Sequence, residues 1–242
     1  MKAAWFLVAL AGCAGARVQV ARDAQQLVVV VTDGWTATRG QLRRYERNAG
    51  GWRAVGATIA VVVGHRGLGW GAGAHASSAR AADEPEKREG DGRAPAGAFR
   101  LREAIGYPQV PPAGTSLSYR QATAALACID EPKAPDYNQL VALADGGSVS
   151  HEPMRRADEL YFYTIVVDHN RAPVVPGRGS CIFLHRWSAP DAPTVGCTAM
   201  AASDLETLLV WLRADANPLY VALPRAVYDR VARSWGLPPV AP

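Results

Sequence analysis

The chain has 242 residues, of which 49% are hydrophobic and 20% are charged, which is the composition of a globular protein with room for one substantial core or two small ones. Its formal net charge is +4, and the basic residues are scattered without a basic strip interleaved with aromatic residues. We therefore expect a single domain with a solvated surface and no nucleic acid as partner.

The first 16 residues have the features of an export signal. Lys2 supplies a short basic region, and the apolar run that follows at 3–10 is far shorter than the roughly 20 residues that a membrane-spanning helix needs. We therefore expect that residues 1–16 direct the chain to the periplasm and that the domain itself spans residues 22–240.

Within this signal, Leu10-Ala11-Gly12-Cys13 resembles the bacterial lipobox, in which the cysteine is lipidated and becomes the first residue of a mature lipoprotein. The alternative is cleavage after a small residue such as Ala16, which gives a soluble periplasmic protein. In the first case Cys13 carries a lipid anchor to the membrane, and in both cases the chain leaves the cytoplasm.

Export changes how the four cysteines are interpreted, because disulfides persist in an oxidising compartment. If Cys13 carries lipid, an odd number of cysteines remains, so that at least one thiol stays free. We expect a disulfide between Cys128 and Cys181 and a free thiol at Cys197. The alternative is that all three are buried and reduced.

Apolar or β-branched runs bounded by turn residues predict β-strands along the chain. In order they are 25–32, 52–55, 58–63, 98–101, 161–167, 181–184 and 219–223. The glycine-rich stretch 64–71 lacks the spacing of a dinucleotide-binding loop, so we expect an ordinary loop there, with His65 and His75 exposed. The polar stretch 79–91 predicts a mobile surface loop.

Helices are predicted at 150–160, at 203–214 and from Pro224 onward. The second is the clearest, because Ser203 and Glu206 have the spacing of a capping box and leucines recur at helical spacing after them. Strands outnumber helices in this pattern. The sequence therefore predicts an α+β domain that is mainly β, with short peripheral helices.

The stretch 177–200 carries the clearest candidate for chemistry. His185 ends a predicted strand, and Cys197 follows Gly196 on a tight turn after a proline-rich loop. A thiol with a pKa of about 8.5 is a poor nucleophile at neutral pH, so a catalytic cysteine needs an imidazole nearby. Gly196 lets the backbone present the Cys197 amide to a developing oxyanion. Because a cysteine is more often a small buried hydrophobe, the spacing alone leaves both interpretations open.

These residues resemble the L,D-transpeptidase catalytic domain family (YkuD-like), in particular a subgroup whose core is GS-x-IFLH followed by T-x-GC. The matching stretches are 179–185 and 194–197, an upstream element at 90–99 similar to GDG-x-TP-x-G-x-F, and further similarity at 136–138 and 167–170. The resemblance extends over residues 25–223. It implies a mixed-sheet or β-sandwich core with short helices around it.

The family uses a cysteine thiolate to attack a peptidoglycan stem tetrapeptide, releases the terminal D-alanine and passes the thioester to an amine. By resemblance, Cys197 is the nucleophile, His185 is the general base and later the acid, and Gly196 with the Cys197 amide forms the oxyanion hole. Candidate contacts to the substrate are Thr194, Asn170, Arg178 and Trp187. The sequence leaves open whether the last three line the cleft or merely pack.

The resemblance implies neither a metal nor a cofactor, and the five histidines show no paired metal-ligand spacing. The chain departs from better-known members beside the nucleophile, where Val195 replaces a histidine and Ala199 a polar residue. These changes leave the acyl acceptor open. We expect an acyltransferase that cross-links stem peptides or attaches protein. The alternatives are a carboxypeptidase or amidase that passes the thioester to water, and a non-catalytic cell-wall-binding lipoprotein.

Overall fold

The computed structural model describes residues 20–143 and 149–240. The expected export signal at 1–16 and the expected lipidation at Cys13 lie outside these described residues. Within them, no helix is both long enough and apolar enough to cross a membrane.

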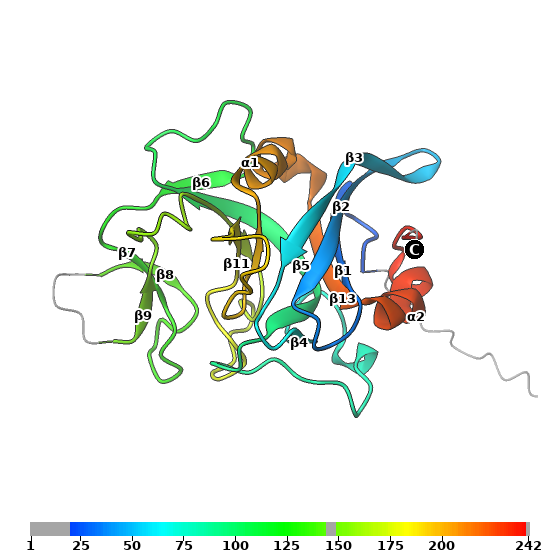
Figure 1. Cartoon of the computed structure of the whole chain (residues 1–242), viewed down its shortest axis with the longest axis horizontal. Coiled ribbons are helices and arrows are strands. Elements are labelled where there is room, and N and C mark those ends of the chain that lie inside the picture. The colour runs from blue at the N-terminus through cyan, green and yellow to red at the C-terminus, as the bar shows by residue number, and fades with distance from the viewer. Residues whose placement is uncertain (1–19, 144–148, 241–242) are drawn as a thin grey trace, which may run out of the picture.

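Most of the strands in the described residues belong to one large mixed β-sheet (Figure 1). Its strands are β1 (Gln26–Thr32), β2 (Arg39–Asn48), β3 (Gly51–Val62), β4 (Leu68–Trp70), β5 (Ala94–Gly106), β6 (Ser118–Gln121), β10 (Tyr163–Val167), β11 (Phe183–Arg186), β12 (Thr198–Met200) and β13 (Leu219–Pro224). The strand order is β10-β11-β12-β3-β2-β1-β13-β5-β4, with β6 beside β5. Because β5 pairs β13 through 97–100 and β10 through 101–106, the sheet closes on itself.

The mainly β, mixed-sheet fold expected from the sequence is confirmed. The centre of the sheet is β1, all of whose residues are buried between antiparallel β2 and parallel β13. A strand covered on both faces has a continuous apolar run in place of alternation, which is why the run of valines at 28–31 predicts this strand so clearly.

The described residues also form two α-helices and two single 3-10 turns: α1 (Ala202–Trp211), α2 (Arg225–Trp235), η1 (Ser77–Ala79) and η2 (Ala214–Ala216). Helix α1 packs on β10 and β11 through its buried leucines, and α2 packs on β1 and β13. The predicted capping box at the start of α1 is wrong. The helix begins at Ala202 with Ala201 as N-cap, so Ser203 lies inside the first turn and caps nothing.

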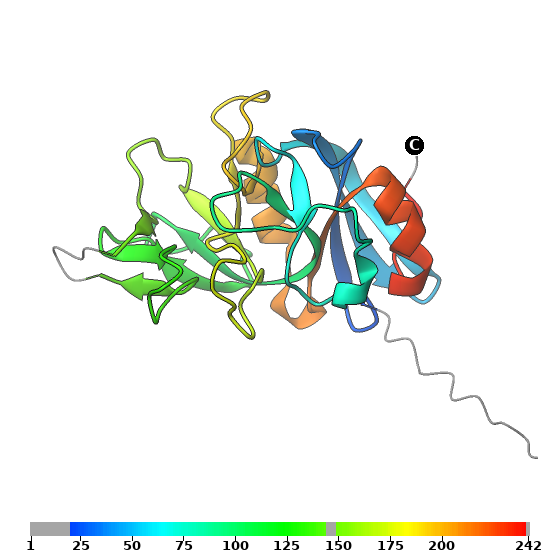
Figure 2. The same ribbon diagram turned by 90° about the horizontal axis from the view of Figure 1, so that it is seen from below.

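A second, three-stranded sheet consists of β7 (Leu126–Ile129), β8 (Leu140–Ala142) and β9 (His151–Pro153) in the order β8-β7-β9. Figures 1 and 2 place it at the end of the molecule opposite α2. The helix predicted at 150–160 is wrong, because 151–153 pairs with β7 and turns follow it. Backbone hydrogen bonds to β7 thus replace those of a helix.

The polar stretch 79–91 is held against the core and is not the free loop that its composition predicts. Glu84 is buried, accepts a hydrogen bond from Trp70 Nε1 at 2.8 Å and pairs with Arg230 at 2.8 Å. His75 is also not exposed, because its ring packs 5.2 Å from that of Trp70 and 5.4 Å from that of Trp235. His65 is exposed as expected.

Candidate active site

The topology brings His185 and Cys197 to one side of the sheet. Strands β11 and β12 are parallel neighbours in which His185 pairs with Ala199. Side chains alternate along a strand, so Cys197, two residues before Ala199, faces the same side as His185. Both residues line one cavity of about 510 Å³.

Three parts of the chain form the walls of this cavity. The loop before β5 contributes Lys87, Glu89 and Gly90; the small sheet and the segment after it contribute Asp130, His151, Glu152, Pro153, Arg156, Leu160 and Tyr161; the central stretch contributes Ser180, Cys181, Ile182, His185, Trp187, Ser188, Ala192, Pro193, Thr194, Val195, Gly196, Cys197 and Ala199. The cavity therefore lies between the large and the small sheet, with the candidate nucleophile in its wall.

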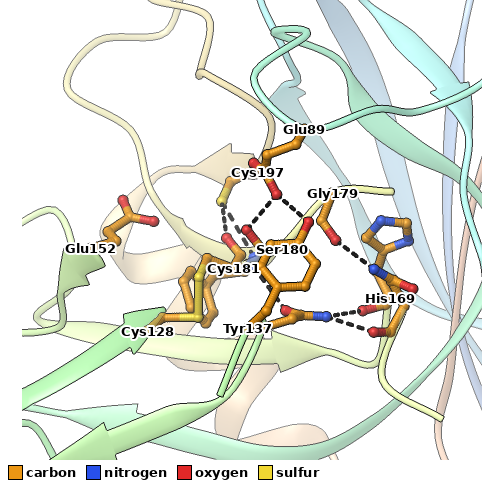
Figure 3. Close-up of a disulfide and its surroundings, with 12 residues drawn as sticks. Glu89, Cys128, Tyr137, Glu152, His169, Gly179, Ser180, Cys181 and Cys197 are labelled. Atoms are coloured by element: carbon orange, nitrogen blue, oxygen red, sulfur yellow. Dashed lines mark hydrogen bonds between the residues drawn. A yellow bond between two sulfur atoms is a disulfide. The ribbon is translucent and has the colours of Figure 1, made fainter. Parts of the chain in front are cut away.

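Cys197 is a buried free thiol, with 7% of its surface exposed. Its Sγ accepts a hydrogen bond from Phe183 N at 3.3 Å and donates one to the carbonyl oxygen of Cys181 at 3.6 Å (Figure 3). Burial, followed by the nearby Glu152 carboxylate, raises the pKa of Cys197 to about 12. The Cys197 side chain is therefore a neutral thiol at pH 7.

His185 is a buried, neutral imidazole. Its Nδ1 lies 2.8 Å from the carbonyl oxygen of Arg186, and because a carbonyl can only accept, Nδ1 carries the proton. The lone pair is then on Nε2. Burial lowers the pKa of His185 to about 4, so the ring stays neutral at pH 7 and can accept a proton. The group that orients His185 is thus a main-chain carbonyl, which the sequence could not identify.

The turn before Cys197 is closed by Thr194. Its Oγ1 donates to the carbonyl oxygen of Cys197 at 2.6 Å and accepts from Gly196 N at 3.2 Å. The Gly196 amide is therefore engaged and is not free for the oxyanion hole expected from the sequence. The Cys197 amide has no acceptor among the described residues, so it is the amide of this turn that can donate to an oxyanion.

Of the other candidate substrate contacts, Trp187 and Thr194 line the cavity and Asn170 and Arg178 do not. Asn170 is 1% exposed, and its amide donates to the carbonyls of Val175 at 2.9 Å and Gly179 at 3.0 Å. It holds a loop closed. The Arg178 guanidinium forms an ion pair with Glu86 on the surface. The sequence does not separate these roles, because all of them call for polar residues at strand ends.

A disulfide joins Cys128 of β7 to Cys181, the pairing proposed from the sequence. Asn138 holds the same segment, accepting from Cys181 N at 3.0 Å and donating to the carbonyls of His169 and Asn170 at 2.9 and 2.7 Å. Figure 3 shows this frame beside Cys197. The carbonyl that receives the Cys197 thiol is thereby fixed from both sides.

We expect the double variant Cys128→Ala/Cys181→Ala to unfold more easily than the oxidised wild type, by about 2–4 kcal/mol, because the disulfide restricts the unfolded chain. It closes a span of 53 residues. Urea unfolding of both proteins measures the difference, with reduced wild type as the matched control. Equal stability of variant and oxidised wild type would contradict a structural disulfide.

Stability should also depend on pH through two buried neutral histidines. Burial lowers the pKa of His169 to about 3 and that of His185 to about 4. In the unfolded chain the pKa of a histidine side chain is about 6.5. Below about pH 6.5 the unfolded state binds protons that the folded state does not, so the free energy of unfolding should fall, by up to about 1.4 kcal/mol for each histidine and pH unit. Urea midpoints at pH 7 and pH 5 test this, and equal midpoints would refute it.

The sequence did not point to several charged or polar residues of the cavity, among them Lys87, Glu89, Glu152 and Tyr161. Glu89 accepts hydrogen bonds from Ser180 and from Tyr137, and the hydroxyl of Tyr161 donates to Glu152. A weak signal was present for Lys87, since Asp91, the aspartate of the GDG-like element, follows it by four residues. Among the described residues, no group of three or more His, Cys, Asp or Glu side chains is arranged to hold a metal ion.

Comparison with known proteins gives one positive finding. The model of the YkuD family, described as the L,D-transpeptidase catalytic domain, matches residues 15–221. No curated protein and no solved structure matches the chain significantly. The matched range includes the cavity walls with Cys197 and His185.

Proposed function

Since the chain belongs to the L,D-transpeptidase catalytic domain family, whose domain implies a peptidoglycan substrate, we propose that it is an acyltransferase that forms a thioester between Cys197 and a stem tetrapeptide. The observation that carries the proposal is the cavity, in which a free thiol, a neutral imidazole and an unengaged Cys197 amide lie together.

In the proposed first half-reaction, the Cys197 thiol gives its proton to Nε2 of His185 as Sγ attacks the carbonyl of the third stem residue. The oxyanion accepts a hydrogen bond from the Cys197 amide. The carbon–nitrogen bond to the terminal D-alanine then breaks, and the imidazolium returns the proton to the leaving amine. The product is a thioester at Cys197 and free D-alanine.

In the second half-reaction, an amine loses a proton to the neutral His185 and attacks the thioester. A new amide bond forms, and the sulfur leaves and recovers the proton. Thiol and imidazole are both neutral at rest, so proton transfer accompanies attack and does not precede it as a stable ion pair. Water in place of the amine gives a carboxypeptidase with the same thioester.

The acceptor is the open part of this proposal. Val195, which stands where better-known members carry a histidine, is 79% exposed at the rim of the cavity. An exposed valine offers no hydrogen bond to an incoming amine. We propose an amine acceptor because the family is one of transpeptidases, and treat water as the second candidate.

Incubation with muropeptides that contain tetrapeptide stems tests the function. The expected products are D-alanine and dimers cross-linked between the third residues of two stems. Free tripeptide stems without dimers would identify water as the acceptor. Release of no D-alanine from any tetrapeptide donor would refute both versions and leave a binding protein.

We further propose that the reaction takes place in the periplasm, on the basis of the signal-like residues 1–16 and of a disulfide that persists in an oxidising compartment. Lipidation of Cys13 would tether the enzyme to the membrane. Fractionation of cells that express wild type and Cys13→Ser tests this, since only a lipoprotein should move from the membrane to the soluble fraction.

A further inference from the structure

Lys87 is a buried cation in the cavity wall. Only 4% of it is exposed, and its Nζ donates hydrogen bonds to Asp91 Oδ1 and to the carbonyl oxygen of Arg88, both at 2.7 Å. An ammonium group has three N–H donors, so one remains without an acceptor among the described residues. A buried charged group normally has hydrogen-bond partners for all its donors. The third N–H of Lys87 is therefore available to a group of a bound ligand.

The ammonium lies beside the nucleophile. A Cβ placed on Gly196 would be 3.9 Å from Lys87 Nζ, and Gly196 is the residue directly before Cys197. The aliphatic stem passes Gly179, where an added Cβ would be 3.0 Å from Lys87 Cε. The positive charge acts on the thiol as well, lowering the pKa of Cys197 against the larger effect of burial.

The position of this ammonium is fixed before any substrate arrives. Asp91, its ion-pair partner, accepts hydrogen bonds from the backbone amides of Arg88 at 2.7 Å and Arg93 at 2.9 Å. The GDG-like element thus forms a rigid loop around the lysine. Little conformational entropy is left to lose when a ligand binds there.

The rest of the cavity is unsuited to an anion. Apart from Lys87 and Arg156, the charged groups of its walls are the carboxyl groups of Glu89, on the same loop as Lys87, and of Asp130 and Glu152 from the small sheet and the segment after it, and these disfavour a further negative charge. Arg156, the other permanent cation of the cavity wall, is already paired with Asp158 at 2.6 Å and lies 3.6 Å from Glu152. An anionic group of a substrate therefore has one favourable place, next to Lys87 and the nucleophile.

In a donor peptide that is cleaved one residue before its C-terminus, the leaving residue carries the free carboxylate. This carboxylate lies within one residue length, about 3.3–3.6 Å, of the reacting carbonyl. We propose that the unused N–H of Lys87 binds this carboxylate of the leaving residue, so that Lys87 selects donors that end one residue after the scissile bond. This inference rests on the proposed function. Asp91 is a positioning residue for the same contact.

The test compares two donors, a stem tetrapeptide with a free terminal carboxylate and the same peptide with a terminal carboxamide. Wild type should release alanine from the carboxylate donor with a kcat/KM roughly 10- to 150-fold higher than that for release of alaninamide from the carboxamide donor. This factor is the effect expected from one hydrogen bond to a charged group. Lys87→Met should reduce the ratio to near one by losing activity on the carboxylate donor alone.

Lys133, which is exposed and outside the cavity, provides the matched control, since Lys133→Met should keep the wild-type ratio. Equal use of both donors by wild type would overturn the inference without any variant, so it does not depend on the folding of Lys87→Met. An equal loss on both donors in Lys87→Met would overturn it too, because the lysine would then act on the oxyanion or the fold. Release from neither donor by wild type would refute the proposed function itself.

Discussion

Replacement of Cys197 by alanine is expected to remove D-alanine release from stem tetrapeptides, by on the order of 10⁴-fold or more, down to the uncatalysed background. The thioester cannot form without Sγ, and Cys197 is the only cysteine within the described residues that lies outside a disulfide. A coupled assay for free D-alanine measures the effect. Turnover by the variant at the wild-type rate would exclude cysteine acyl transfer.

The control for this variant is its stability. Cys197 lies in the apolar cluster between the large and the small sheet, where it contacts Cys181 and Phe183. Alanine removes one sulfur atom from that cluster and leaves the Phe183 amide without its acceptor, which should lower stability modestly, by about 1–3 kcal/mol. Urea unfolding therefore separates loss of the nucleophile from loss of the fold.

The second large effect is expected for His185→Ala, in which kcat should fall by roughly 10²- to 10⁴-fold while KM changes little. The thiol, whose pKa is raised to about 12, then has no base to accept its proton at neutral pH. Steady-state kinetics on the tetrapeptide donor give the two constants separately. A wild-type kcat in this variant would remove His185 from the mechanism.

Addition of free imidazole distinguishes a catalytic role of His185 from a purely structural one. The variant leaves a space in the cavity wall where the ring packed 5.1 Å from the ring of Tyr161. If His185 acts as the base, added imidazole should restore part of kcat in proportion to its concentration. If the variant has lost the fold, imidazole should have no effect.

The low pKa of His185 and the high pKa of Cys197 have a common cause in burial between the two sheets. An ion pair of thiolate and imidazolium would place two charges in this apolar environment. In the proposed mechanism the two neutral groups avoid that cost at rest, and the proton moves only as Sγ attacks a bound carbonyl. The buried ammonium of Lys87 adds a fixed positive charge to the same region.

Much of the fold follows from the sequence because its strongest signals are local. The apolar runs at 25–32, 161–167 and 219–223 correspond to β1, β10 and β13, whose burial leaves no room for alternation. The helix predicted at 150–160 fails because 151–153 is captured by β7, which the disulfide also holds. Tertiary pairing of this kind cannot be seen in a single segment.

In the candidate site, too, some features follow from the local sequence and others depend on tertiary contacts. Resemblance to the family motif makes Cys197 and His185 the candidates, and the odd number of cysteines that remains if Cys13 is lipidated predicts at least one free thiol. The two remaining contributions depend on contacts across the chain: the Arg186 carbonyl orients the imidazole, and the loop around Asp91 carries Lys87 to the nucleophile. That loop is polar, so composition alone predicts a mobile segment, although each of its charges near the cavity has a partner in the folded state.

The proposed mechanism requires that a covalent acyl-enzyme forms at Cys197. Mixing the native protein with a tetrapeptide donor in the absence of an amine acceptor, quenching with acid and measuring the intact mass tests it most directly. The expected result is a mass increase equal to the donor minus D-alanine, which peptide mapping assigns to Cys197 and which Cys197→Ala lacks. Release of D-alanine without an adduct in wild type at any quench time, or an adduct that maps to another residue, would contradict the account.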